Sequence, residues 1–384
     1  MRGNPESFLW LQDQRQEKDV NKIRETLEED QGKNYILGIR ENCLNLYYCG
    51  MSMAKIEADE KVGCKYTTAY CNDKKPLSYD EFWGNLHNIR QNIEAFVGTN
   101  DKRDHSAILT GGKGSKSHPE KDKQQWIMNM NNSDPKAAWY FVDMEYIYKG
   151  ESKSHPYGRA DLIAVRKTPD EEGIHDVAFI ELKTGIGAYK ASSISDEERK
   201  ILKKDLFDER VIGIKLGSGL ASHIIDYMHF FKEDFYQNDT RQEIINILTI
   251  YRTLGIIPED RTSEHPWYDF KKEQLAEVPR IYIVTYPKPG ECTSLRKTKE
   301  QFYKYLYNDF EKGKGSSSKS IENLLSEEQL SGLLSQDAKV NFKSFIENDS
   351  KHAISEKQKI GQRTFDFCFT FVDDPLEPNC LDLI

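Results

Sequence analysis

The segment from Asp176 to Lys183 constrains the fold of this chain more than any other. It reads Asp-Val-Ala-Phe-Ile-Glu-Leu-Lys, and alternate side chains of an extended strand point to opposite faces. Val177 and Phe179 would share one face with Glu181 and Lys183, while Ala178, Ile180 and Leu182 make the opposite face apolar after Asp176. Strands that are apolar on both faces are typical of the buried centre of a sheet covered by helices. The segment therefore predicts an α/β fold.

The charged residues of this strand have two interpretations. A surface hairpin with solvent-facing charges would place polar neighbours around Glu181, yet the sequence places Val177 and Phe179 there. Burying a glutamate and a lysine costs free energy. Buried charges of this kind gather at functional sites. We therefore interpret Glu181 and Lys183 as site residues.

Two further strand-like runs precede this segment, at residues 138–148 and 157–165. A loop from Lys167 to Gly173, rich in Pro, Asp and Glu, separates the second run from the third and lets the two strands pair as a hairpin. Asp161 lies in the second run and would then meet Glu181 across the strand pair. The sequence thus predicts two adjacent carboxylates on neighbouring strands.

This set of residue types favours one kind of chemistry. Two carboxylates repel each other unless a cation lies between them. Oxygen ligands suit Mg²⁺, for which Mn²⁺ can substitute. Lys183 cannot bind the metal, but it can hold or deprotonate a water molecule, or stabilise negative charge on a phosphate. The predicted reaction is hydrolysis of a phosphodiester bond.

The spacing of these residues resembles a known family of nucleases. Asp161 is followed after nineteen residues by Glu181-Leu182-Lys183, and Gly158-Arg159-Ala160 leads into the aspartate. This pattern is similar to that of the PD-(D/E)XK, or restriction endonuclease-like, superfamily. The resemblance covers about residues 118–290 and implies a helix–strand–strand–strand–helix–strand core. Helical patterns at 120–131 and 218–235 and a strand pattern at 280–286 complete that order.

The resemblance implies a function and a ligand set. It implies a Mg²⁺-dependent nuclease, acting on DNA rather than RNA, in restriction, anti-phage defence or repair. The carboxylates of Asp161 and Glu181 and the carbonyl of Leu182 would hold the metal, and Lys183 would position the attacking water. A further acidic residue is expected nearby. Glu120, on the first helix, is favoured for that place, and Glu145 is kept as an alternative metal ligand.

The core leaves large segments on both sides. We predict an N-terminal accessory region with an antiparallel sheet at 1–98, the nuclease core at 99–290, and a helical extension with a final strand at 291–384. Other helical patterns lie at 6–30, 78–97, 195–210, 241–254, 294–310 and 321–347, and other strand patterns at 35–40, 44–48, 51–58, 65–70 and 363–372.

Some polar residues near the core can be explained either by a structural role or by a role in the site. His223 and Tyr227 lie four residues apart on the helix at 218–235, as do Ser222 and Asp226. We interpret this helix as amphipathic and capped by Ser218, with a site role for His223 as the alternative. Contacts to phosphate are a further alternative for Lys190, Lys203, Lys204 and the basic loop at 111–117, although a solvated surface is favoured for the three lysines.

Composition limits the partners. The chain has 54 Lys and Arg against 63 Asp and Glu, so its formal net charge is −9. This excludes a protein that coats nucleic acid by bulk charge, but not one that binds through a local patch. There is no apolar run near the ~20 residues of a membrane helix and no signal-peptide core at the N-terminus, so we expect a cytoplasmic protein without a membrane partner. Seven scattered cysteines predict packed, reduced thiols.

The segments outside the core also suggest an assembly. These segments are too long to be minor additions to the core, and they predict that the protein forms a homo-oligomer or binds a protein partner. The alternative function is therefore a catalytically silent or partner-controlled subunit that binds nucleic acid.

Overall fold

A computed structural model describes most of the first three quarters of the chain and one hairpin beyond it. The described residues are 3–29, 35–59, 61, 63–71, 75–97, 119–148, 157–184, 223, 226–227, 230–231, 233–257, 268–269, 271–286, 353–360 and 363–371. Expected helices at 195–210, 294–310 and 321–347, the loop at 111–117 and the lysines of 190–204 lie outside these ranges.

The described chain forms two compact units, each made of separate segments. Unit 1 consists of Met1–Met144, Leu162–Val177 and Gln237–Glu277, and unit 2 of Glu145–Asp161, Ala178–Tyr236 and Val278–Ile384. The three predicted regions stay predictions. The α/β class is confirmed, because an N-terminal antiparallel sheet and a second, mixed sheet are both present together with helices.

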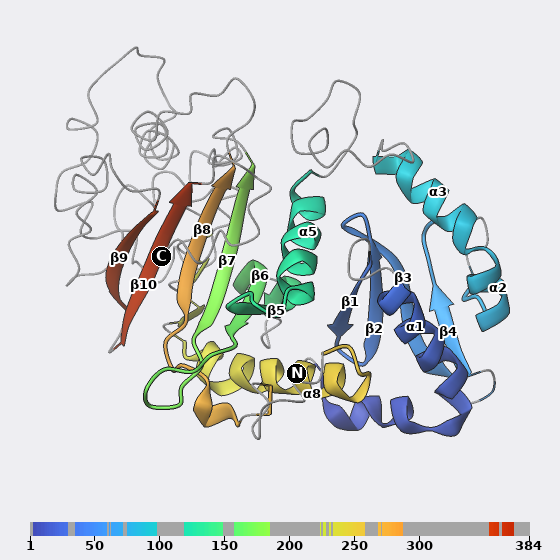
Figure 1. Ribbon diagram of the computed structural model, residues 1–384, viewed down its shortest axis with the longest axis horizontal. Helices are drawn as coiled ribbons and strands as arrows, with labels where there is room; N and C mark the ends of the chain where they lie inside the picture. The colour runs from blue at the N-terminus through green and yellow to red at the C-terminus, as the bar shows by residue number, and fades with distance from the viewer. Residues whose placement is uncertain are drawn as a thin grey trace, which may run out of the picture. The chain divides into compact units, whose positions relative to one another are not determined.

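The N-terminal sheet lies in unit 1 and has four antiparallel strands in sequence order (Figure 1). They are β1 (Tyr35–Arg40), β2 (Cys43–Tyr48), β3 (Met51–Asp59) and β4 (Gly63–Thr67). The predicted hairpin is confirmed, with Arg40 opposite Cys43. The next turn, Cys49-Gly50, has φ values of 54° and 71°. Two positive φ angles in a two-residue turn match the right-handed twist of the paired strands.

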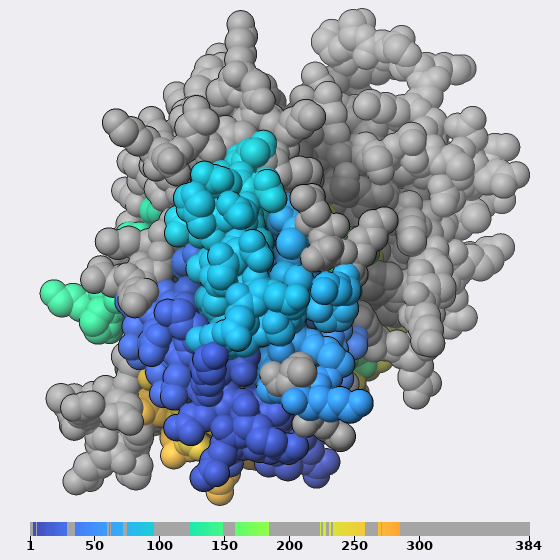
Figure 2. Space-filling view, turned by 90° about the vertical axis from the view of Figure 1, so that its right-hand side faces the viewer, coloured from blue at the N-terminus to red at the C-terminus, as the bar shows by residue number. Residues whose placement is uncertain are grey.

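Helices cover this sheet. Before the strands, the chain forms two 3₁₀ helices, η1 (Pro5–Gln12) and η2 (Gln14–Gln16), and then helix α1 (Glu17–Glu29). After the strands, it forms helices α2 (Tyr79–Gly84) and α3 (Leu86–Val97). Figure 2 shows α1, α2 and α3 from outside, as a blue-to-cyan layer at the surface of unit 1. Tyr66 of β4 stacks on Phe82 of α2 with ring centroids 4.5 Å apart. The apolar faces expected from helical spacing thus meet the sheet.

One predicted helix is two. The pattern at 78–97 predicts a continuous helix, but α2 ends at Gly84 and α3 begins at Leu86, so the helix is interrupted at Asn85. Ser78 caps α2 as expected, in a capping box with Glu81. Glycine and asparagine are poor helix formers, and the Asn85 side chain donates to the carbonyl of Glu81 at 2.8 Å, which closes the last turn.

Two more helices of unit 1 agree with the sequence patterns. Helix α5 (Pro119–Ser133) begins at proline, as expected for a first helical turn, and α8 (Arg241–Thr253) follows a short π-helix, η5 (Tyr236–Thr240). The side chain of Asn132, near the end of α5, bonds both backbone groups of Phe141, at 2.7 and 2.9 Å. No helix among the described residues is long and apolar enough to cross a membrane.

The second sheet is mixed and has the order β5-β6-β7-β8-β10-β9. Its strands are β5 (Trp139–Tyr148), β6 (Tyr157–Arg166), β7 (Val177–Thr184), β8 (Arg280–Tyr286), β9 (Ala353–Ile360) and β10 (Arg363–Phe371). Strand β8 runs parallel to both β7 and β10, and β9 pairs with β10 as an antiparallel hairpin. The sequence predicted every strand of this sheet except β9. That strand, Ala-Ile-Ser-Glu-Lys-Gln-Lys-Ile, is charged, which is typical of the edge position it holds.

Candidate functional site

Strand β7 carries the candidate site and lies inside the second sheet, between β6 and β8. Every residue from Val177 to Lys183 is buried, including Glu181 (1% exposed) and Lys183 (4% exposed). The prediction of a central strand buried on both faces is confirmed, and the surface-hairpin alternative is wrong.

A short helical stretch of unit 2 covers the face of β7 that bears these charges. Phe179 shares that face, and its ring lies 5.6 Å from Phe231, 5.9 Å from Phe230 and 6.2 Å from Tyr227, between ring centroids. These aromatic contacts hold the helical residues over the strand. His223, one helical turn before Tyr227, is thereby placed beside Glu181.

The carboxylate of Glu181 has two nitrogen partners. Lys183 Nζ forms an ion pair and hydrogen bond with Oε1 of Glu181. His223 Nε2 lies 3.3 Å from the same oxygen. The helix at 218–235 is therefore more than the amphipathic cover that the sequence favoured, because His223 reaches the predicted site. Its spacing to Tyr227, at i and i+4, was the signal for this placement.

Asp161 is joined to β7 through the backbone. Its Oδ2 accepts a hydrogen bond of 2.6 Å from the backbone N–H of Leu182. The N–H and C=O groups of one strand residue point to the same side of the strand. The carbonyl of Leu182 is thus directed toward β6 as well, on the side where Asp161 lies. The structure brings together Asp161, Glu181, Leu182 and Lys183, the central predicted residues.

Two further acidic candidates have different positions. Glu120 lies in the first turn of α5, in unit 1, and its side chain is outside the described part of the structure. Glu145 lies on β5 in unit 2, is half-buried, and has a φ of 55°. A positive φ is uncommon for a residue other than glycine and marks a local irregularity of the strand at Glu145. The site role of Glu120 and the metal-ligand role of Glu145 stay predictions.

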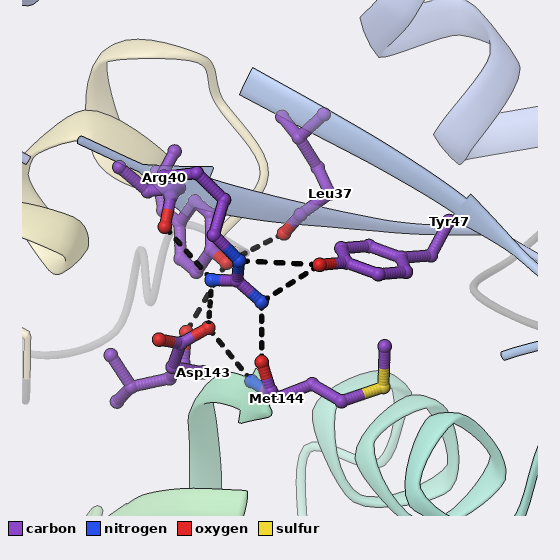
Figure 3. A network of polar contacts seen from close by, with 8 residues as sticks. Leu37, Arg40, Tyr47, Asp143 and Met144 are labelled. Atoms are coloured by element: carbon purple, nitrogen blue, oxygen red, sulfur yellow. Dashed lines mark hydrogen bonds and ion pairs between the residues drawn. The ribbon is translucent and has the colours of Figure 1, made fainter. Parts of the chain in front are cut away.

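Asp143, two residues before Glu145, has a structural partner in unit 1. It forms an ion pair with Arg40, whose guanidinium also donates to the carbonyl of Met144 and, at 3.0 Å, to the hydroxyl of Tyr47 (Figure 3). Burial is the largest influence on the pKa of Arg40 and lowers it, but the charges and hydrogen bonds of Asp143 and Tyr47 together outweigh burial and hold that pKa above its usual value. We therefore assign Asp143 a structural role, as the partner of Arg40.

Asp226 adds a third carboxyl group around β7. It is half-buried, and burial raises its pKa to about 7; the positive charge of Arg159 opposes this shift, and the negative charge of Glu181 adds to it. The hydroxyl of Tyr227 is completely buried, and burial together with the charges of Glu181 and Asp161 raises its pKa well above the usual value. That hydroxyl makes no hydrogen bond of ordinary geometry with a described residue, although its interaction with the Glu181 carboxylate contributes to the rise of its pKa.

These groups can be tested against the predicted metal. A buried polar atom that makes no hydrogen bond of ordinary geometry often marks the place of a water or ion, and the Tyr227 hydroxyl is such an atom near the charges of Glu181 and Asp161. Within the described ranges, no three Asp, Glu, His or Cys side chains form a ready-made metal cluster. Mg²⁺ keeps several waters and commonly takes only one or two protein carboxylates. Asp161 and Glu181, with the Leu182 carbonyl, therefore fit Mg²⁺ and do not fit a metal that needs an all-protein cage.

Asp226 leads to a prediction about pH. Because its pKa is higher in the folded protein than in the unfolded chain, Asp226 favours folding at low pH and this contribution is lost as the pH rises toward 7. Replacing Asp226 with asparagine should therefore stabilise the protein more at about pH 8 than at about pH 5, by about 2 kcal/mol. Urea denaturation of both proteins at both pH values measures this. An equal effect at the two values would contradict the assignment.

Gly158 is required by the backbone at the start of β6. Its φ is +61°, and a Cβ atom there would lie 2.4 Å from the ring of Phe230. Gly158→Ala should destabilise the protein by about 2–4 kcal/mol, because left-handed strain and a clash add together. Gly173→Ala is the matched control: its φ is +81° but nothing lies within 4 Å of the added atom. Thermal denaturation should show a clearly smaller loss for Gly173→Ala, and equal losses would contradict the clash.

Comparison with known proteins gives no further assignment, since no family model, no curated protein and no solved structure matches the chain.

Proposed function

We propose that this protein is a Mg²⁺-dependent nuclease with a restriction endonuclease-like core, which hydrolyses phosphodiester bonds of nucleic acid, DNA rather than RNA. One observation carries the proposal: Asp161 of β6 accepts a hydrogen bond from the backbone of Leu182, between the members of the buried Glu181–Lys183 pair on the adjacent strand β7 of a mixed sheet. A purely structural role is a poor account of this arrangement, because a buried ion pair contributes little net stability.

Each residue has a role that follows from its position. Asp161 and Glu181 would hold Mg²⁺ with the Leu182 carbonyl, which is directed to the same side as the Asp161 carboxylate. When bound, the metal supplies a Lewis acid for the phosphoryl oxygen and lowers the pKa of a bound water. Lys183 donates a hydrogen bond to the attacking water and stabilises negative charge that develops on the phosphate. His223 holds Glu181 in place through the contact at Oε1.

The proposal is tested by metal-dependent cleavage of plasmid DNA, with single-stranded DNA and RNA as further substrates. Wild-type protein should cleave with Mg²⁺ or Mn²⁺ and fail to cleave with EDTA. Asp161→Ala should lose cleavage, because it removes one of two carboxylate ligands. Asp176→Ala is the matched control, since Asp176 also lies at the β6–β7 hairpin but pairs with Arg166 at 3.5 Å near the surface.

The outcomes separate the proposal from its alternative. If the wild-type protein and Asp161→Ala cleave equally, the activity comes from a contaminant and the proposal fails. If neither cleaves any substrate with either metal, yet the wild-type protein binds DNA, the catalytically silent or partner-controlled binding subunit is the better account. Light scattering tests the proposed homo-oligomer, and a monomer at all concentrations would leave a protein partner as the remaining form of assembly.

A further inference from the structure

Arg159 is a charged residue of the site that the proposed mechanism does not use. It lies two residues before Asp161 on β6, so the two side chains share one face of the strand. The guanidinium is exposed, and it makes no hydrogen bond or ion pair with any residue that the structure describes. The cationic neighbour Lys183, in contrast, is buried and engaged with Glu181.

A second observation places the charge of Arg159 near the other site residues. Its positive charge acts on the carboxyl of Asp226, which lies on the helical stretch that covers β7 and which also responds to the charge of Glu181. Arg159 is therefore close to the carboxylates electrostatically, while its side chain remains open to solvent. An exposed cation beside a buried acidic cluster is suited to meet an anion that arrives from solution.

We infer that Arg159 binds a phosphate of the nucleic-acid backbone next to the scissile bond, and so determines how the substrate is held against Asp161. This inference rests on the proposed function. A planar guanidinium can donate two parallel hydrogen bonds to phosphate oxygens, which a point charge cannot do. The Arg159 guanidinium would hold the nucleic-acid backbone before and after the bond is cut, without taking part in the chemical step. It would bind substrates of any sequence, because phosphates carry no sequence information.

The role also reconciles the overall charge with a nucleic-acid substrate. A protein with net charge −9 gains no affinity from bulk attraction. Its affinity must come from a few local cations placed around the metal-binding carboxylates. Arg159 is such a cation, exposed and on the same face of β6 as Asp161.

The test compares Arg159→Gln with Arg159→Lys in the full-length protein. We expect Arg159→Gln to raise KM about tenfold and to change kcat by less than about threefold. Binding of a fluorescent DNA duplex in EDTA, followed by anisotropy over a range of salt, should show a slope of log K against log salt that is reduced by about 0.9. Arg159→Lys should keep the slope, because the charge remains, and should raise KM by a smaller factor.

Arg166→Gln is the matched control, because Arg166 is an exposed arginine of the same strand, seven residues on and therefore on the opposite face, paired with Asp176. The inference is overturned if Arg159→Gln leaves KM and the salt slope unchanged, if it lowers kcat alone, or if Arg166→Gln has the same effects. If the wild-type protein binds but never cleaves, the proposed nuclease fails while a slope reduced only in Arg159→Gln still supports phosphate binding. If it neither cleaves nor binds, both are wrong.

Discussion

Replacing Lys183 with methionine is expected to lower kcat for DNA cleavage by about a thousandfold, with a small change in KM. The amine is 4% exposed and pairs with Glu181, so it is placed to donate to the attacking water or to the phosphate in the transition state. Removing one such preorganised donor typically costs a factor of about 10²–10³ in rate. The methionine side chain fills nearly the same volume, so no cavity should form; Glu181 loses its lysine partner and some stability with it, but it keeps His223 at 3.3 Å.

The measurement is single-turnover cleavage of a labelled duplex, with circular dichroism to confirm folding. Lys167→Met is the control, because Lys167 is also a partly buried lysine, whose amine donates to the carbonyl of Asp134 at 2.9 Å outside the site. That variant should lose some stability and keep its cleavage rate. Equal rate losses in the two variants would show that the effect of Lys183→Met is not specific to the site.

Replacing Arg40 with methionine should lower the free energy of unfolding by about 3–5 kcal/mol, because it leaves Asp143 (1% exposed) as a buried charge without its cation. The carbonyl of Met144 and the hydroxyl of Tyr47 lose a donor at the same time. The double variant Arg40→Met with Asp143→Leu should recover much of the loss, since a buried ion pair can be replaced by apolar residues at little cost.

A double-mutant cycle measured by urea denaturation gives the coupling between the two residues. Lys18→Met with Asp80→Leu is the comparison cycle, because Lys18 and Asp80 also form an ion pair in unit 1, at 3.3 Å, but at the surface. Surface pairs contribute about 0–1 kcal/mol. Coupling of the Arg40 pair no larger than that of the Lys18 pair would contradict the structural role assigned to it.

The sequence predicts the centre of the site well, because strand parity and burial are local properties. Alternation along β7 was enough to place Glu181 and Lys183 on one face, and the apolar residues around them were enough to predict burial. The break at Gly84-Asn85 could also have been recognised from composition, since both residues are poor helix formers.

The rest of the site depends on register and packing between distant elements. The bond from Leu182 to Asp161 requires knowledge of how β6 aligns with β7, which the loop between them does not specify. Likewise, His223 and Asp226 reach the site only because aromatic residues of their helix pack on Phe179. The pair of Arg40 and Asp143 joins residues 103 positions apart in the chain, and no short-range pattern announces it.

The division of unit 1 into separate segments has a consequence for how the protein is made. Tyr251 donates to the carbonyl of Leu37, 214 positions earlier in the chain, and to that of Val142. Unit 1 is complete only with the segment that ends at Glu277. At the usual ribosomal speed of about 5–20 residues per second, helix α8, which carries Tyr251, is synthesised on the order of ten seconds or more after the N-terminal strands of unit 1. During this interval the nascent chain exposes a sheet whose final partner has not been synthesised, and chaperones that act during translation have their clearest opportunity there.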